Sequence, residues 1–82
     1  MELKDTIELM LSEDYKDRFK AEYWQTKIRY NKLRNMIGKY NAGTLEFKPV
    51  CPIGGLIEQW EAMGNYLDML EIRAKIEGIS LE

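Results

Sequence analysis

Cations and aromatic rings alternate along the first half of the chain, and these are the residues best suited to binding a ligand. Residues 16 to 39 carry eight Lys and Arg against two Asp and Glu, a net charge of +6. The aromatic residues among and beside them are Tyr15, Tyr23, Trp24, Tyr30 and Tyr40. Cations bind phosphates and flat rings stack on bases, so the combination suits a nucleotide ligand.

The flanking segments carry the opposite charge. Residues 1 to 15 hold one Lys against five Asp and Glu, a net charge of -4, and residues 56 to 77 hold two Lys and Arg against five, a net charge of -3. A basic helix beside acidic segments also helps to specify helix pairing, and composition alone does not separate this structural interpretation from nucleotide binding. The net charge of -2 for the whole chain favours a compact anion over extended nucleic acid, which needs a broad positive field.

Groups for catalysis or metal binding are scarce. The chain has no His and one Cys, Cys51, which excludes a disulfide framework, a zinc cluster and a histidine-activated nucleophile. The pairs Asp68/Glu71 and Glu58/Glu61 have the i,i+3 spacing of a helix, which is typical of carboxylates on a solvated helix face. We therefore expect no enzymatic activity, no metal site and no cofactor.

The spacing of apolar residues predicts an all-α fold with a short N-terminal helix and a long antiparallel two-helix hairpin. The expected elements form a single domain, residues 1–82: a short helix at about 5–11, a helix at about 13–39, a loop at 40–55 and a helix at about 56–77. Asp5 or Thr6 is the expected cap of the short helix and Ser12 that of the first long helix. Gly54-Gly55 is expected to end the loop, and Gly78 to stop the last helix.

Apolar residues on both long helices exceed what one hairpin can cover. A heptad seam on the second helix predicts lengthwise packing against the first: Leu56, Trp60, Met63, Leu67, Leu70 and Ala74. Further apolar residues lie off the two facing stripes: Trp24, Ile28, Met36, Ile57, Tyr66, Met69, Ile72 and Ile76. Because a chain of 82 residues has a thin core, these spare faces predict an oligomeric helical assembly.

The first residues do not read as a targeting segment. Met1 to Leu11 contains four charged residues, and no apolar run reaches membrane-spanning length. We expect a cytoplasmic protein without a membrane partner.

Two segments carry a resemblance to a known family. The string DYKDRFKAEYWQTKIRYNKLRNMI contains the ordered set Tyr15, Arg18, Glu22, Arg29, Leu33 and Met36-Ile37. Later, Cys51-Pro52 is followed by a helix reading QWEAMGNYLDMLEIRAKIEGI. Over residues 6 to 79 the chain resembles the small phage proteins that share the anti-CBASS and anti-Thoeris sponge hairpin domain.

The resemblance implies a function and an assembly. It implies a phage or prophage protein, in the cytoplasm of the bacterial host, that captures the cyclic nucleotide second messengers of bacterial immunity and keeps the effector proteins silent. The messengers are cyclic oligonucleotides or cyclic ADP-ribose derivatives, and they are not cleaved. Family members assemble into interlocked homo-oligomers, often hexamers, and hold the ligand in pockets between protomers.

The resemblance also implies roles for particular residues. Tyr15 matches the position that stacks on a base, and Arg18 lies one turn later. Lys27, Arg29 and Tyr30 cover the register of the phosphate-binding cation, and whether Lys27, Arg29 or Lys32 contacts phosphate stays open. Arg73 with Gly78-Ile79 resembles the part that contributes to a second type of pocket in some members. Where relatives often read Cys-Pro-Arg-Ser, this chain has Cys51-Pro52-Ile53-Gly54 and lacks that cation and serine cap.

Two other functions compete with the sponge. A helical-bundle adaptor would bind a host or phage protein through spare apolar residues such as Trp24, Ile28 and Tyr66. An enzyme that degrades the messenger would need a general base or metal that we do not find in the sequence.

Overall fold

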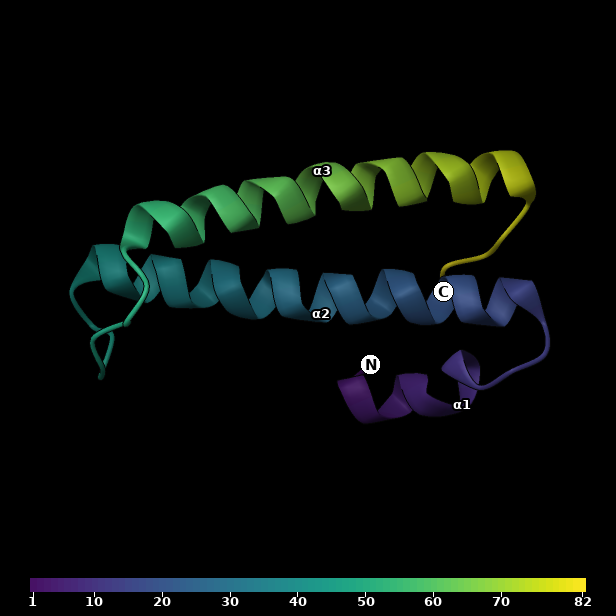
Figure 1. Ribbon diagram of the computed structural model, residues 1–82, viewed down its shortest axis with the longest axis horizontal. Helices are drawn as coiled ribbons and strands as arrows, with labels where there is room; N and C mark the ends of the chain where they lie inside the picture. Colours follow the sequence, from purple (N-terminus) through teal and green to yellow (C-terminus); the bar gives the residue numbers. More distant parts are fainter.

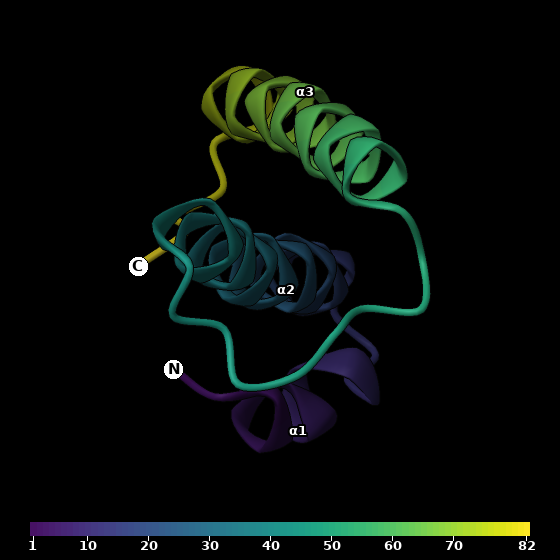
Figure 2. The same cartoon turned by 90° about the vertical axis from the view of Figure 1, so that its left-hand side faces the viewer.

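The computed structural model describes residues 1–82 and consists of helices without strands. A 3₁₀ turn, η1, spans Leu3–Thr6 and leads into the one-turn helix α1, Ile7–Met10; the long helices are α2, Tyr15–Ala42, and α3, Ile53–Glu77. The two long helices run antiparallel side by side (Figure 1). Figure 2 shows α2 between α3 and the N-terminal segment. The all-α prediction, a short N-terminal helix plus a long hairpin, is confirmed.

The start of α2 differs from the prediction. Its N-cap is Asp14, whose carboxylate accepts a hydrogen bond from the backbone N–H of Lys16 at 2.9 Å. Ser12 supports this cap from outside, because its hydroxyl oxygen accepts from the N–H of Asp14 and its hydroxyl donates to Asp17. An aspartate next to the first turn also suits the positive end of the helix dipole, so Asp14 takes the position we expected for Ser12.

The short helix also begins earlier than predicted. Asp5 does not cap α1; its carboxylate accepts from the backbone N–H of Glu2 at 2.8 Å and so closes the η1 turn. Thr6 stands at the N-cap position of α1 without a side-chain capping bond, and its hydroxyl donates to the carbonyl of Leu3 at 2.7 Å. Local side-chain bonds have therefore extended the helical segment back to Leu3.

The loop between the long helices is shorter than predicted. Helix α2 continues through Gly38 to Ala42 and ends at Gly43, the first residue that is in the left-handed conformation (φ 75°). Helix α3 begins at Ile53 rather than Leu56, because the carbonyl of Pro52 accepts the first helical bonds from Gly55 and Leu56. A Cβ at position 55 would lie 3.1 Å from Cys51 Sγ, so this glycine permits close packing inside the first turn.

The core of the hairpin is small and lies toward the end where α2 begins and α3 ends. Its members come from α2, α3 and the C-terminal tail: Phe19, Tyr23, Leu67, Leu70, Ala74 and Ile79. Toward the loop end the same interface is half-buried, and there the rings of Tyr30 and Trp60 stack with centroids 5.4 Å apart. The predicted seam thus faces α2, and only its last three residues are fully buried.

The C-terminal tail covers a residue that we expected to lie in solvent. After Gly78 (φ 69°), which ends α3 as predicted, the chain folds back along the hairpin (Figure 1). Trp24 Nε1 donates to the carbonyl of Leu81 at 2.7 Å, and Ile79 is buried against the core. Trp24 is half-buried as a result. The prediction that Trp24 is a spare apolar residue was wrong, because it ignored this short tail.

The N-terminal segment covers a different face of α2. Thr6 is buried, and its hydroxyl accepts a hydrogen bond from the Gln25 side chain at 3.0 Å. Large apolar side chains remain exposed on α3, at Met69 (62%), Ile72 (59%) and Ile76 (79%). None of the helices combines the length and the apolar character needed to cross a lipid bilayer.

Replacing Leu70 by alanine should remove a large part of the stability. Leu70 is 1% exposed at the centre of the core, and a buried Leu→Ala change costs about 2–5 kcal/mol of unfolding free energy. Urea unfolding followed by circular dichroism, at fixed protein concentration, measures the loss. Val50→Ala, in the exposed loop, is the control and should change stability by less than about 0.5 kcal/mol. Equal losses for the two variants would contradict this core assignment.

Stability should fall in alkaline solution because of Tyr23. Burial, followed by the hydrogen bond that its hydroxyl donates to Glu71 at 2.9 Å, raises the pKa of Tyr23 to about 12. In the unfolded chain this pKa is about 10. The folded state holds the proton longer, so the contribution is complete below about pH 10 and is lost as the pH rises toward 12. Unfolding free energy measured from pH 8 to 12 should decline more steeply for the native sequence than for Tyr23→Phe; parallel curves would refute the effect.

Candidate functional site

A hydrogen bond between the two long helices joins two of the residues singled out above. Arg73 Nη2 donates to the hydroxyl of Tyr15 at 2.6 Å. Tyr15 is the first residue of α2, and Arg73 lies one turn before the end of α3. The antiparallel arrangement brings these ends together, although the two residues are 58 positions apart in the sequence.

The guanidinium of Arg73 is held on three sides. Its Nε donates to the Glu77 carboxylate at 3.1 Å, one helical turn further along α3. Its central carbon lies 5.0 Å from the centroid of the Phe19 ring, a cation–π arrangement. The hydrogen bond to Glu77 is the main reason that the pKa of Arg73 is raised, and the side chain therefore stays a cation.

Tyr15 presents a partly exposed ring beside this cation. Tyr15 as a residue is 46% exposed, and its ring lies at a tilt to that of Phe19, with centroids 6.2 Å apart. Desolvation, followed by hydrogen bonding to Glu77, raises the pKa of Tyr15 despite the opposing charge of Arg73. The phenol is therefore neutral at physiological pH, and its ring can stack on another flat group.

Arg18 and Glu22 complete a hollow of about 300 Å³ around this pair. The hollow is lined by Tyr15, Arg18, Phe19, Glu22 and Arg73. Arg18 donates one hydrogen bond, at 2.7 Å, to the carbonyl of Ser12, and a guanidinium has five N–H donors in total. Two guanidinium groups, one tyrosine ring and one carboxylate thus meet in one place. Such a site suits a ligand that carries both an anionic group and a flat ring.

Glu22 is fixed from the opposite helix. Its Oε1 accepts a hydrogen bond from the hydroxyl of Tyr66 at 2.6 Å, and this bond is the main cause of the raised pKa of Tyr66. Sequence reasoning placed no site role on Glu22, Phe19 or Glu77. Two signals pointed to Glu22: it belongs to the ordered set that carries the family resemblance, and it lies on the same helical face as Tyr15 and Arg18, at intervals of three and four residues.

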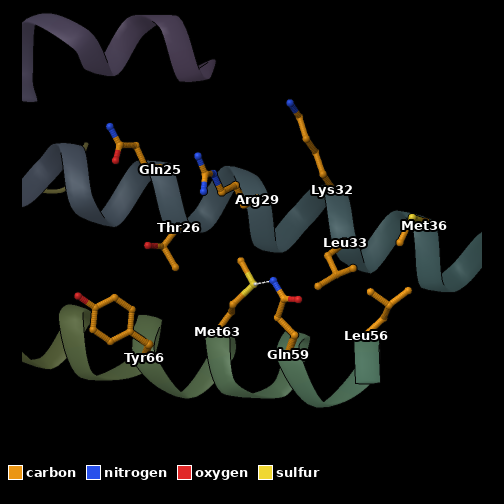
Figure 3. Close-up of a pocket in the computed structure, with 10 residues that line it drawn as sticks. All are labelled: Gln25, Thr26, Arg29, Lys32, Leu33, Met36, Leu56, Gln59, Met63 and Tyr66. Atoms are coloured by element: carbon orange, nitrogen blue, oxygen red, sulfur yellow. Dashed lines mark hydrogen bonds between the residues drawn. The ribbon is translucent and has the colours of Figure 1, made fainter. Parts of the chain in front are cut away.

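A larger groove of about 690 Å³ continues between α2 and α3 toward the loop end (Figure 3). It is lined by Gln25, Thr26, Arg29, Lys32, Leu33, Met36, Leu56, Gln59, Met63 and Tyr66. Figure 3 shows Leu33, Leu56 and Met63 between the helices, whereas Lys32 extends away from α3. The bond from Tyr66 to Glu22 marks the boundary with the smaller hollow, because Tyr66 lines one and Glu22 the other.

The structure separates the cations among which the sequence could not choose. Arg29 and Lys32 both line the groove, and the Lys32 side chain points away from α3 (Figure 3). Lys27 Nζ lies 5.6 Å from the ring centroid of Tyr30, and that ring stacks on Trp60 inside the hairpin. Residues two positions apart on an α-helix point in directions that differ by about 200°. Lys27 and Arg29 of a single chain therefore cannot both face one ligand. Of the predicted residues, the structure thus gathers Tyr15, Arg18 and Arg73 and leaves Lys27 and Tyr30 elsewhere.

Gly78 lies near the hollow without lining it. It is the C-cap of α3, and its carbonyl is 3.5 Å from Lys16 Nζ. No three Cys, Asp or Glu side chains gather in an arrangement that could hold a metal ion.

Comparisons with known proteins give one match. Neither the curated proteins nor the solved structures contain a match to this chain. A family model described as Sequestin matches residues 13–76, which include most of both long helices and every residue that lines the smaller hollow. The family name denotes sequestration. Because the match covers well over half of the sequence, the chain belongs to the Sequestin family.

Proposed function

We propose that this protein is a phage anti-defence sponge that binds cyclic nucleotide immune messengers and sequesters them in the cytoplasm of the bacterial host. The observation that carries the proposal is the Tyr15–Arg73 pair, joined across the hairpin beside Arg18. Membership in the Sequestin family supports a sequestering role. The proposed ligands are cyclic oligonucleotides or cyclic ADP-ribose derivatives.

Arg18 and Arg73 are the groups that bind phosphate. Guanidinium groups match phosphate oxygens with pairs of parallel hydrogen bonds. Arg73 is already oriented by Phe19 and Glu77, which lowers the entropy lost when a ligand binds. An incoming phosphate competes with Glu77 for Arg73, while the half-exposed ring of Tyr15 stacks on a base.

The proposal contains no cleavage step. Arg18 and Arg73 act as fixed cations, and the raised pKa of Tyr15 keeps its phenol neutral. In this account the messenger is removed from its receptors by mass action alone, so the protein must bind it at least as tightly as the receptors do.

We further propose that the sponge is a homo-oligomer, like the members of the family that it resembles, which are often hexamers. Within one chain Tyr15 is 46% exposed, so a single hollow does not enclose its ligand. The exposed residues Met69, Ile72 and Ile76 lie on the same part of α3 as Arg73. A neighbouring chain packed on this apolar strip would cover the hollow and slow ligand release.

The structure weakens one of the three anchors of the adaptor alternative, because Trp24 donates its N–H to Leu81 and is half-buried. Tyr66 donates its hydroxyl to Glu22, but the residue is still 42% exposed. The strip Met69, Ile72 and Ile76 remains available to a protein partner. Response to nucleotide separates the two functions, because an adaptor should be indifferent to it.

A thermal-shift screen against cyclic dinucleotides, cyclic trinucleotides and cyclic ADP-ribose isomers tests the proposal. Ligand at 100 times its Kd stabilises the folded state by about 2.7 kcal/mol, so one class should raise the melting temperature by several degrees. Tyr15→Ala and Arg73→Ala should abolish the rise. The exposed residues Tyr40 and Arg34 lie outside the hollow, so Tyr40→Ala and Arg34→Ala should retain it. No shift with any compound at saturating concentration would contradict the sponge and favour the adaptor.

A further inference from the structure

The smaller hollow contains a carboxylate where a simple phosphate site would have none. Glu22 lines it together with Arg18 and Arg73. A carboxylate accepts hydrogen bonds and repels phosphate, so the part of the ligand that faces Glu22 must carry hydrogen-bond donors. A fully ionised phosphate group has only acceptor oxygens and offers no such part. The site therefore selects a ligand with an anionic end toward the arginines and a donor edge toward Glu22.

The position of Glu22 relative to Tyr15 suits a donor edge that belongs to a base. The two residues are seven positions apart on α2, which is two turns along one face and about 10 Å of helix. Arg18 lies between them. A hollow of about 300 Å³ is at the small end for a ligand pocket, so it takes one base rather than a whole cyclic messenger. A base stacked on Tyr15 can then point its Watson–Crick edge along the helix face toward Glu22.

Tyr66 fixes the orientation of the Glu22 carboxylate. Its hydroxyl donates to Oε1 of Glu22 at 2.6 Å, and the resulting rise in the pKa of Tyr66 keeps that hydroxyl a donor. Each carboxylate oxygen has two acceptor positions, so Oε2 and one position on Oε1 are available to a ligand. Tyr66 comes from α3, so the orientation of Glu22 is set by the hairpin itself.

We propose that Glu22, positioned by Tyr66, makes the site selective for guanine-containing cyclic nucleotides. Guanine presents two adjacent donors on its Watson–Crick edge, N1–H and the 2-amino group, and these match the two oxygens of a carboxylate. Hypoxanthine keeps N1–H and lacks the 2-amino group. Adenine has only its 6-amino donor on that edge and places the N1 acceptor against the carboxylate. This inference rests on the proposed function and adds the identity of the preferred base.

Binding titrations with three cyclic dinucleotides of identical backbone test the inference: cyclic di-GMP, cyclic di-IMP and cyclic di-AMP. The native sequence should bind them in that order of affinity, with a guanine-to-adenine ratio of about tenfold or more, as expected for a two-donor contact to a base edge. Glu22→Gln should lower the affinity for cyclic di-GMP and bring the three affinities close together. Tyr66→Phe should also lower the ratio of the affinity for cyclic di-GMP to the affinity for cyclic di-IMP. Glu61→Gln, an exposed carboxamide substitution on α3 outside the hollow, should leave all ratios unchanged.

The outcomes separate this inference from the proposed function. Equal affinity of the native protein for the three compounds, or an equal loss for all three in Glu22→Gln, would overturn the role of Glu22 and leave the sponge intact. Binding of cyclic ADP-ribose isomers but of no cyclic dinucleotide would do the same. Failure to bind any cyclic nucleotide would overturn both.

Discussion

The packing of Phe19 against the last turns of α3 is the contact on which the rest of the structure depends. Phe19 and Tyr23 meet Leu67, Leu70 and Ala74 in a core that includes few other residues. That contact sets the register of the hairpin, and the register decides which polar side chains meet across it. The same Phe19 ring lies under the guanidinium of Arg73, so one aromatic residue both holds the helices together and orients the cation beside Tyr15.

Tyrosine hydroxyl groups fix the rotation of the helices about this core. The hydroxyl of Tyr23 on α2 donates to Glu71 on α3, and that of Tyr66 on α3 donates to Glu22 on α2. These bonds run in opposite senses between the helices, so neither helix can turn about its axis without breaking one of them. A small protein with eight buried residues thus holds its polar groups in defined places. The candidate site uses side chains from this framework and needs no separate loop.

The spacing of apolar residues predicted the helices. Where the helices begin and end depended on contacts that this spacing does not describe. The start of α3 at Ile53 follows from the carbonyl of Pro52 and from the close approach of Cys51 to Gly55. Trp24 could not be placed correctly, because the tail that covers it through Leu81 has no helical pattern. By contrast, Gly78 ended α3 as its backbone freedom predicts.

The candidate site was predictable in part for the same reason. Tyr15 and Arg18 lie on one helical face, which the sequence shows directly. Their meeting with Arg73 required the register of the hairpin, which comes from packing between residues far apart in the chain. That Lys27 and Arg29 point in different directions follows from helical geometry, but which of them faces the groove depended on where α3 lies.

The central claim is that the protein sequesters its ligand without cleaving it, and recovery of the intact ligand tests this claim most directly. The protein is incubated for hours with a cyclic nucleotide that it binds, freed of unbound ligand by gel filtration, and unfolded by heat, and the released ligand is quantified by chromatography. The account predicts that the bound messenger is retained through gel filtration and is recovered intact in full. Recovery of a linear or hydrolysed product, or loss of the ligand during gel filtration, would contradict it.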